Sequence, residues 1–172
     1  MTPVIQLYSG EYFDYTRPDD GPYHITDIAR SLSNLCRYTG HVSHFYSVAQ
    51  HCVLASQMAP PFLQMAALLH DAAEAYLGDV NSPLKTMLPD YARLEEQVER
   101  ALFERFHVPW EQMAQIKSID WKMLATERFA LMPLDDTNYW PDHHPYLINI
   151  RPWDPLEAEQ QYLNRFMEIY RR

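Results

Sequence analysis

Residues 62–77 of the sequence are FLQMAALLHDAAEAYL. This segment consists almost wholly of apolar and helix-forming residues, and Gly78 follows it at the position of a C-cap glycine, so it predicts one buried helix. Three ionisable residues interrupt the apolar pattern: His70, Asp71 and Glu74. On a helix, His70 and Glu74 share a face, and Asp71 lies beside them. Such groups are costly on an apolar helix unless they are paired or bind a metal; the alternative is a polar edge that faces solvent.

A second histidine is expected opposite His70. Pro60-Pro61 interrupts the helical pattern midway between His51 and His70, so the flanking helices can fold back as an antiparallel hairpin. Each histidine would then lie about 13 Å from the turn, at about 1.5 Å per residue. His44 and His41 would lie further along the helix. The spacing therefore selects His51 as the partner of His70 at a metal.

A fourth metal ligand is predicted on a later helix. Asp120 lies in the middle of IKSIDWKMLATER, residues 116–128, although aspartate is a poor helix former. Glu127 lies two helical turns further on, on the same side. The alternative interpretation of Asp120 is a surface carboxylate that pairs with Lys117.

The candidate metal ligands combine nitrogen and oxygen donors. They are His51, His70, Asp71 and Asp120. This donor set suits one borderline divalent ion such as Zn²⁺, Mn²⁺, Co²⁺ or Fe²⁺. On a six-coordinate ion it leaves positions for water and a phosphate oxygen, which favours metal-assisted chemistry on a phosphoryl group.

The pattern of apolar residues predicts one all-α domain over residues 1–172, with about six or seven helices. The metal-bearing helical core is expected over residues 24–132. Within it, a short helical turn is expected between residues 79 and 91. Longer helices are expected at 26–38, 43–58, 62–77, 91–106 and 111–132.

The two ends of the chain differ in character. Residues 1–23 alternate polar and aromatic side chains and predict an irregular arm, with a short strand pair near 5–8 and 12–15. Residues 133–153 are rich in proline and aromatic residues and predict a loop. The final helix is expected over 154–172, because its DPLE start supplies an N-cap aspartate, a proline in the first turn and a glutamate three residues after the cap.

Composition excludes several classes of protein. The net charge is −9 and no basic run occurs, which argues against general binding of nucleic acid polymers. Cys36 and Cys52 do not form a CxxC pair and predict buried thiols in a reducing compartment. The N-terminus lacks the pattern of a signal peptide, and no apolar stretch reaches the roughly 20 residues that span a bilayer. A cytoplasmic protein that makes no membrane contact is therefore expected.

The ligands and their surroundings resemble the HD-domain metal-dependent phosphohydrolase superfamily, and most closely its bacterial and phage nucleotide hydrolases. The resemblance covers residues 24–132. Its specific part is the ordered set of ligands with an HDxxExxxxDxxxPxK continuation that starts at His70. The segments that carry it are FYSVAQHCVL, AALLHDAAEAYLGDVNSPLK and KSIDWKMLATER. The resemblance implies that the helical bundle is an HD domain and that the chain forms a homo-oligomer, a dimer or larger.

The resemblance also implies roles for residues beside the metal. Glu74 matches a catalytic carboxylate that orients or activates water, and Asp79 matches an acid that protonates the leaving oxygen. Lys85 matches a phosphate-facing lysine, and a solvated loop lysine is an equally good alternative. Apart from the resemblance, Arg37 and His41 precede the second helix and are candidates for contact with phosphate or sugar. The alternative for these two residues is stabilisation of a helix C-terminus.

One metal, rather than two, is expected. Binuclear members of the superfamily require further histidines between the His-Asp pair and the last aspartate, and only His107 lies in that interval. His143-His144 lies in the proline-rich segment, where exposure is the simpler explanation.

The expected function is hydrolysis of a nucleotide phosphate ester. A 5'-(deoxy)nucleotidase, which releases phosphate from a nucleoside monophosphate, is favoured because few cations cluster along the sequence. The first alternative is a dNTP triphosphohydrolase that releases triphosphate. The second is an HD domain that binds nucleotide without turnover, against which the presence of Glu74 and Asp79 argues.

Overall fold

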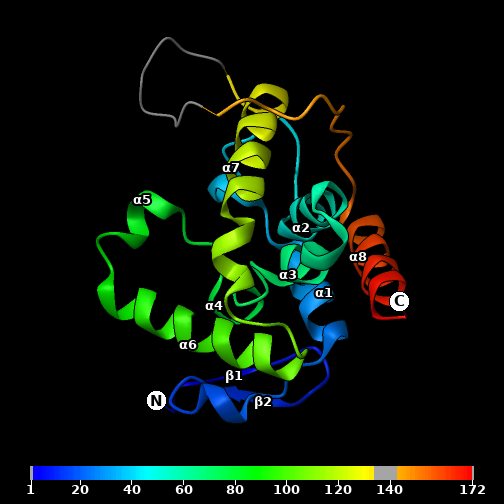
Figure 1. Cartoon of the computed structure of the whole chain (residues 1–172). Helices are drawn as coiled ribbons and strands as arrows, with labels where there is room; N and C mark the ends of the chain where they lie inside the picture. Colours follow the sequence, from blue (N-terminus) through cyan, green and yellow to red (C-terminus); the bar gives the residue numbers. More distant parts are fainter. Residues whose placement is uncertain (1, 134–142, 172) are drawn as a thin grey trace.

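A computed structural model describes residues 2–133 and 143–171 (Figure 1). It confirms the all-α class, since helices make up most of the described chain. The α-helices are α1 Ile25–Asn34, α2 Val48–Met58, α3 Gln64–Leu69, α4 Glu74–Leu77, α5 Ser82–Lys85, α6 Pro89–Arg105, α7 Gln112–Leu131 and α8 Pro155–Tyr170. There are also three 3-10 turns in the described chain: η1 Pro18–Asp20 precedes α1, η2 Arg37–Gly40 lies between α1 and α2, and η3 Pro61–Leu63 lies between α2 and α3. No helix in the described ranges is both long and apolar enough to cross a membrane.

Helix α2 lies at the centre of the core. Residues on every side of it are buried, including Val48, Ala49, Cys52 and Val53, because α1, α3, α7 and α8 all pack against it. Figure 1 shows α2 and α3 side by side between α7 and α8. The α2–α3 pair, joined through η3, is the antiparallel hairpin that the two prolines predict.

The N-terminal arm contains the expected strand pair. Strand β1 (Val4–Gln6) pairs antiparallel with β2 (Tyr12–Asp14), and Ile5 lies opposite Phe13. Phe13 and Tyr23 are buried in the main core against Tyr76 of α4, with ring centroids 4.7 and 5.2 Å away. The arm is therefore packed against the helical core.

The segment 62–77 is not the single helix that its apolar pattern predicts. The chain leaves α3 after Leu69 and forms tight turns over 70–73, with hydrogen bonds from Ala72 N to Leu69 O and from Glu74 N to Asp71 O. The imidazole Nδ1 of His70 also bonds to Ala67 O at 2.8 Å. Periodicity could not reveal this break, because both α3 and α4 are buried and the apolar pattern continues across it.

Two other predicted helices are shorter than expected. The helix expected at 26–38 ends at Asn34, since Leu35 is extended and Cys36 forms an isolated antiparallel bridge with Ser47. The helix expected at 43–58 begins at Val48, because Ser47 caps it by accepting a hydrogen bond from Gln50 N. Helices α6, α7 and α8 match their predicted ranges to within a few residues at each end. Of the loop predicted at 133–153, residues 134–142 lie outside the described residues, and 143–153 contain no helix or strand.

Candidate metal centre

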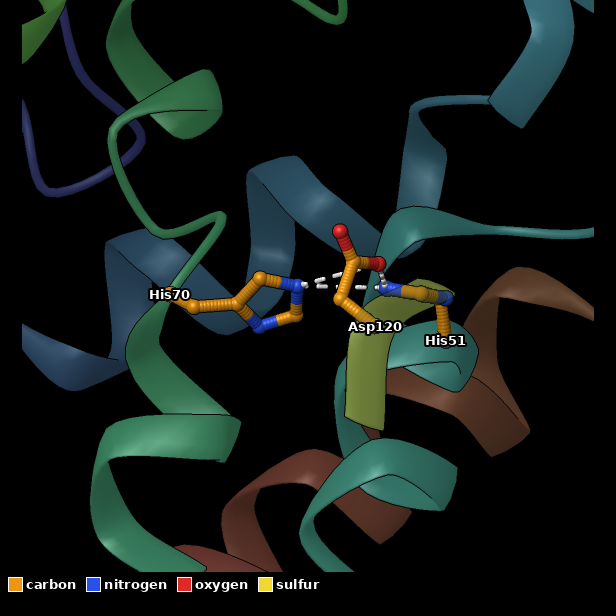
Figure 2. A group of neighbouring side chains, drawn as sticks. All are labelled: His51, His70 and Asp120. Carbon is orange, nitrogen blue, oxygen red and sulfur yellow. Dashed lines mark hydrogen bonds and ion pairs between the residues drawn. The ribbon is translucent and has the colours of Figure 1, made fainter. Parts of the chain in front are cut away.

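Three side chains from distant parts of the chain converge at the centre of the fold (Figure 2). His51 comes from α2, His70 directly follows α3, and Asp120 comes from α7. The Nε2 atoms of the two histidines are 3.2 Å apart. Asp120 Oδ1 lies 3.2 Å from His51 Nε2 and 3.8 Å from His70 Nε2. Asp120 therefore faces the histidines and not Lys117, the surface partner that the sequence left open.

Asp71 completes the predicted donor set. Its Oδ2 lies 3.3 Å from His70 Nε2 and 3.6 Å from His51 Nε2. Ligand atoms that share an ion at about 2.1 Å lie about 3.0 Å apart at right angles and about 3.4 Å apart in a tetrahedron. The separations that involve the two histidines, 3.2–3.8 Å, lie at or slightly above these values. His51, His70 and Asp120 form a group whose ligand atoms all lie within 4.8 Å of one another, and Asp71 lies beside this group, against both histidines.

The outer nitrogen of each histidine also has a hydrogen-bond partner. His70 Nδ1 bonds to Ala67 O at 2.8 Å, and His51 Nδ1 bonds to Glu127 Oε1 at 2.5 Å. Both rings thereby present Nε2 to the cluster, as metal-binding histidines do. Burial raises the pKa of Asp120, but the two histidine rings that face its carboxylate outweigh this effect and hold the pKa well below its usual range.

Glu127 has a larger role than its position in the sequence indicates. Its side chain is fully buried and accepts hydrogen bonds from His51, Arg37, Tyr38 and Tyr46. Burial raises the pKa of Glu127, but the charges of Arg37 and His51 outweigh this effect and lower it to about 2. The sequence offered one signal, the spacing of two helical turns from Asp120, but no indication of these partners.

Glu74 lies at the start of α4, three residues after Asp71. It is 6 % exposed, and burial together with the charges of Asp71 and Asp79 raises its pKa well above the usual value. Its Oε2 has no hydrogen-bond partner among the described residues. A buried carboxyl oxygen without a protein partner suits a site that binds water or substrate.

Asp79 follows Gly78, whose φ of 82° is the positive value that glycine tolerates and that turns the chain out of α4. The carboxyl group is half-buried. Burial raises its pKa, assisted by the charge of Asp71 and opposed by that of Arg37. The charge of Asp79 in turn contributes to the raised pKa of Glu74 across the turn.

The three residues predicted to contact substrate differ in their surroundings. Arg37 lies against the cluster, with Nη1 3.2 Å from Asp71 Oδ2 and Nε 3.1 Å from Glu127 Oε2. Lys85 is paired with Glu95 at 2.7 Å. His41 is exposed, and within the described chain no hydrogen bond or ion pair joins its side chain to the cluster.

Cys52 borders the cluster on the side of His70. Its sulfur, a His70 nitrogen and an Asp71 oxygen lie within 4.8 Å of one another. Burial raises the pKa of the thiol to about 11. The prediction of a buried thiol at this position is confirmed, whereas Cys36 is only partly buried.

A helical fold that brings two histidines and an aspartate together, with a second aspartate beside them, is typical of a metal-binding helical protein. The profile of the HD domain family matches residues 28–122. The chain therefore belongs to the HD domain family, within the superfamily of HD-domain metal-dependent phosphohydrolases.

Two relatives extend this similarity beyond the matched region. An Escherichia coli K12 protein named "Uncharacterized protein YfdR" is 43% identical over 169 residues, which cover 96% of this chain and 94% of the relative. An uncharacterized protein of Rhodobacter capsulatus is 34% identical over 122 residues, covering 65% of this chain and 62% of the relative. The first similarity includes both the N-terminal arm and the final helix.

Proposed function

We propose that this protein is a metal-dependent nucleotide phosphohydrolase, and specifically a 5'-(deoxy)nucleotidase. The observation that carries the proposal is a cation fixed beside the candidate metal centre: Arg37 lies 3.2 Å from Asp71 and is only 11 % exposed. A guanidinium group binds phosphate oxygens with defined geometry. A cation and a metal held together in this way form a binding site for a phosphoryl group.

His51, His70, Asp71 and Asp120 would hold the metal. When bound, a divalent ion supplies Lewis-acid polarisation of the phosphoryl group and lowers the pKa of water. Glu74 has a buried, unpartnered oxygen with which to orient the attacking water. Asp79 has a raised pKa, so it can carry a proton for the leaving ester oxygen.

The balance of charge favours a substrate with one phosphate. Arg37 is already shared between Asp71 and Glu127, and Lys85 is paired with Glu95. A triphosphate carries more negative charge than these two shared cations can offset. The dNTP triphosphohydrolase remains the alternative, and it would require Lys85 to leave Glu95 when substrate binds.

A product assay separates the two activities. Panels of dNMP and dNTP are incubated with the protein and Mn²⁺ or Co²⁺, and phosphate, triphosphate and nucleoside are quantified. The proposal predicts nucleoside and phosphate from dNMP. Triphosphate release from dNTP with dNMP untouched would establish the alternative, and binding of both panels without any product would indicate a domain that binds nucleotide without turnover.

A further inference from the structure

The two oxygens of the buried Glu127 carboxylate face different parts of the site. Oε1 lies 2.5 Å from His51 Nδ1 and 2.9 Å from the Tyr46 hydroxyl. Oε2 accepts hydrogen bonds from the Tyr38 hydroxyl at 2.5 Å and from Arg37 Nε at 3.1 Å. One carboxylate therefore contacts both a candidate metal ligand and the turn that carries the phosphate-binding candidate.

The Oε1 side constrains the imidazole of His51. A neutral imidazole has one N–H and one acceptor nitrogen, and a carboxylate beside Nδ1 selects the form in which Nδ1 is the donor. In the neutral ring that a metal requires, the acceptor is then Nε2, the atom that lies 3.2 Å from His70 Nε2 and 3.2 Å from Asp120 Oδ1. The contact with Glu127 thus directs a lone pair of His51 into the metal-binding cluster.

The Oε2 side constrains the η2 turn. Tyr38 (φ 57°, ψ 31°) and Thr39 (φ 55°, ψ 27°) both adopt the left-handed conformation, which is unfavourable for residues with a Cβ atom. Such a conformation persists only when surrounding contacts hold it. Tyr38 and Arg37 make those contacts through Glu127, and the guanidinium of Arg37 also lies over the Tyr38 ring at 5.2 Å.

We propose that Glu127 is a positioning residue with two separable roles, one for each oxygen. Oε1 sets the tautomer of His51 and thereby the metal affinity. Oε2 holds the strained turn and thereby keeps Arg37 beside Asp71. The contribution to substrate binding rests on the proposed nucleotide hydrolysis, whereas the effects on the tautomer, metal affinity and turn do not depend on it. If Glu127 served only as a buried ion pair, its loss would lower stability without these specific effects.

The first experiment examines the Oε1 side without substrate. Protein with ¹⁵N-labelled histidine is studied by NMR in the metal-free state, and Zn²⁺ affinity is measured by competition with a chelating dye. We expect the neutral ring of His51 to carry its proton on Nδ1 in the parent protein. In Glu127→Gln this preference is lost, and Zn²⁺ affinity falls by about 10- to 100-fold, as for other outer partners of metal-binding histidines.

Thr126→Val is the matched control, since Thr126 is the buried neighbour of Glu127 on α7 and bonds to Tyr146 N at 2.9 Å. We expect Thr126→Val to lower the melting temperature, while the tautomer of His51 and the Zn²⁺ affinity stay unchanged. Unchanged affinity in a folded Glu127→Gln protein would overturn the Oε1 role. If Glu127→Gln does not fold, the NMR spectrum of the parent protein tests the Oε1 role by itself. A neutral His51 ring protonated on Nε2 would overturn that role equally.

The second experiment examines the Oε2 side. Tyr38→Phe removes one hydrogen bond to Oε2, and Tyr46→Phe removes the phenol on Oε1. Hydrogen exchange is followed by mass spectrometry in peptides that cover residues 36–43, and KM is measured for the dNMP that is turned over. We expect Tyr38→Phe to exchange several-fold faster in these peptides and to raise KM several-fold at unchanged Zn²⁺ affinity.

The expected result for Tyr46→Phe is parent-like exchange at the turn. Parent-like exchange and KM in Tyr38→Phe would overturn the Oε2 role. Failure of the proposed function would look different: no nucleotide would be turned over by any protein in the series, while the tautomer, metal affinity and exchange rates would still respond as described.

Discussion

Asp71 contacts both parts of the candidate site, because its Oδ2 lies 3.3 Å from His70 Nε2 and 3.2 Å from Arg37 Nη1. We expect Asp71→Ala to lower Mn²⁺ affinity by at least about 100-fold, since it removes a direct ligand and not merely an outer partner. Isothermal titration with Mn²⁺ measures the change. Asp90→Ala serves as the control, because Asp90 is exposed and pairs only with its neighbour Arg93 in the described chain. Equal affinity of Asp71→Ala and Asp90→Ala would remove Asp71 from the metal site.

Glu74 offers a test of the chemical step apart from metal binding. Glu74→Gln keeps the size of the side chain but removes the carboxyl group that orients the attacking water, so we expect kcat to fall by about 10²- to 10⁴-fold. Metal affinity should change far less than in Asp71→Ala. Steady-state kinetics at saturating Mn²⁺ provide the measurement, and parent-like kcat in this variant would contradict the assignment of Glu74.

The sequence predicted the positions of the metal-binding candidates better than it predicted their partners. His51 followed from the symmetric spacing around Pro60-Pro61, and Asp120 from an aspartate in the middle of a predicted helix. The contacts of Glu127 with Arg37 and Tyr38 join residues 90 and 89 positions apart. Local spacing carries no information about such contacts, because they depend on how α7 packs against the η2 turn.

At the scale of elements, the break between α3 and α4 shows the limit of periodicity. Residues on both sides of 70–73 are buried, so the apolar pattern is continuous although the helix is not. The tight turns place His70 and Asp71 at the end of one helix and Glu74 at the start of the next. An ideal helix, by contrast, would have placed them along a single face.

Helix α6 carries a carboxyl group that gives stability a pH dependence. Burial, followed by the charges of Glu95 and Asp71, raises the pKa of Glu99 from 4.5 to about 7. Between these values the folded protein retains a proton that the unfolded chain has released, so the free energy of unfolding falls as pH rises through this window. The loss is at most about 3 kcal/mol.

Glu99→Gln should remove this dependence and raise the melting temperature at pH 8 relative to the parent. The expected gain is about 2–4 °C for each kcal/mol recovered, with little difference near pH 4. Glu96→Gln, on the exposed side of the same helix, should change stability by less than about 1 kcal/mol. Thermal unfolding at pH 4 and pH 8 measures these differences. If the melting temperatures of Glu99→Gln and the parent changed equally between the two pH values, the prediction would be contradicted.

At the scale of the whole molecule, the class of fold and the α2–α3 hairpin could be predicted because proline positions and apolar spacing are local signals. The packing of the N-terminal arm could not, since Phe13 and Tyr23 reach Tyr76 only in the folded chain. The homo-oligomer stays a prediction, to be measured by light scattering.

The central claim is that one divalent ion, held by His51, His70, Asp71 and Asp120, is required for hydrolysis of a nucleoside monophosphate. The direct measurement is phosphate release from a dNMP by protein stripped with a chelator and titrated with Mn²⁺. The stripped protein should be inactive, and activity should rise to a plateau at about one bound ion per chain. Full activity in the stripped protein, or a plateau reached only at two bound ions, would contradict the claim.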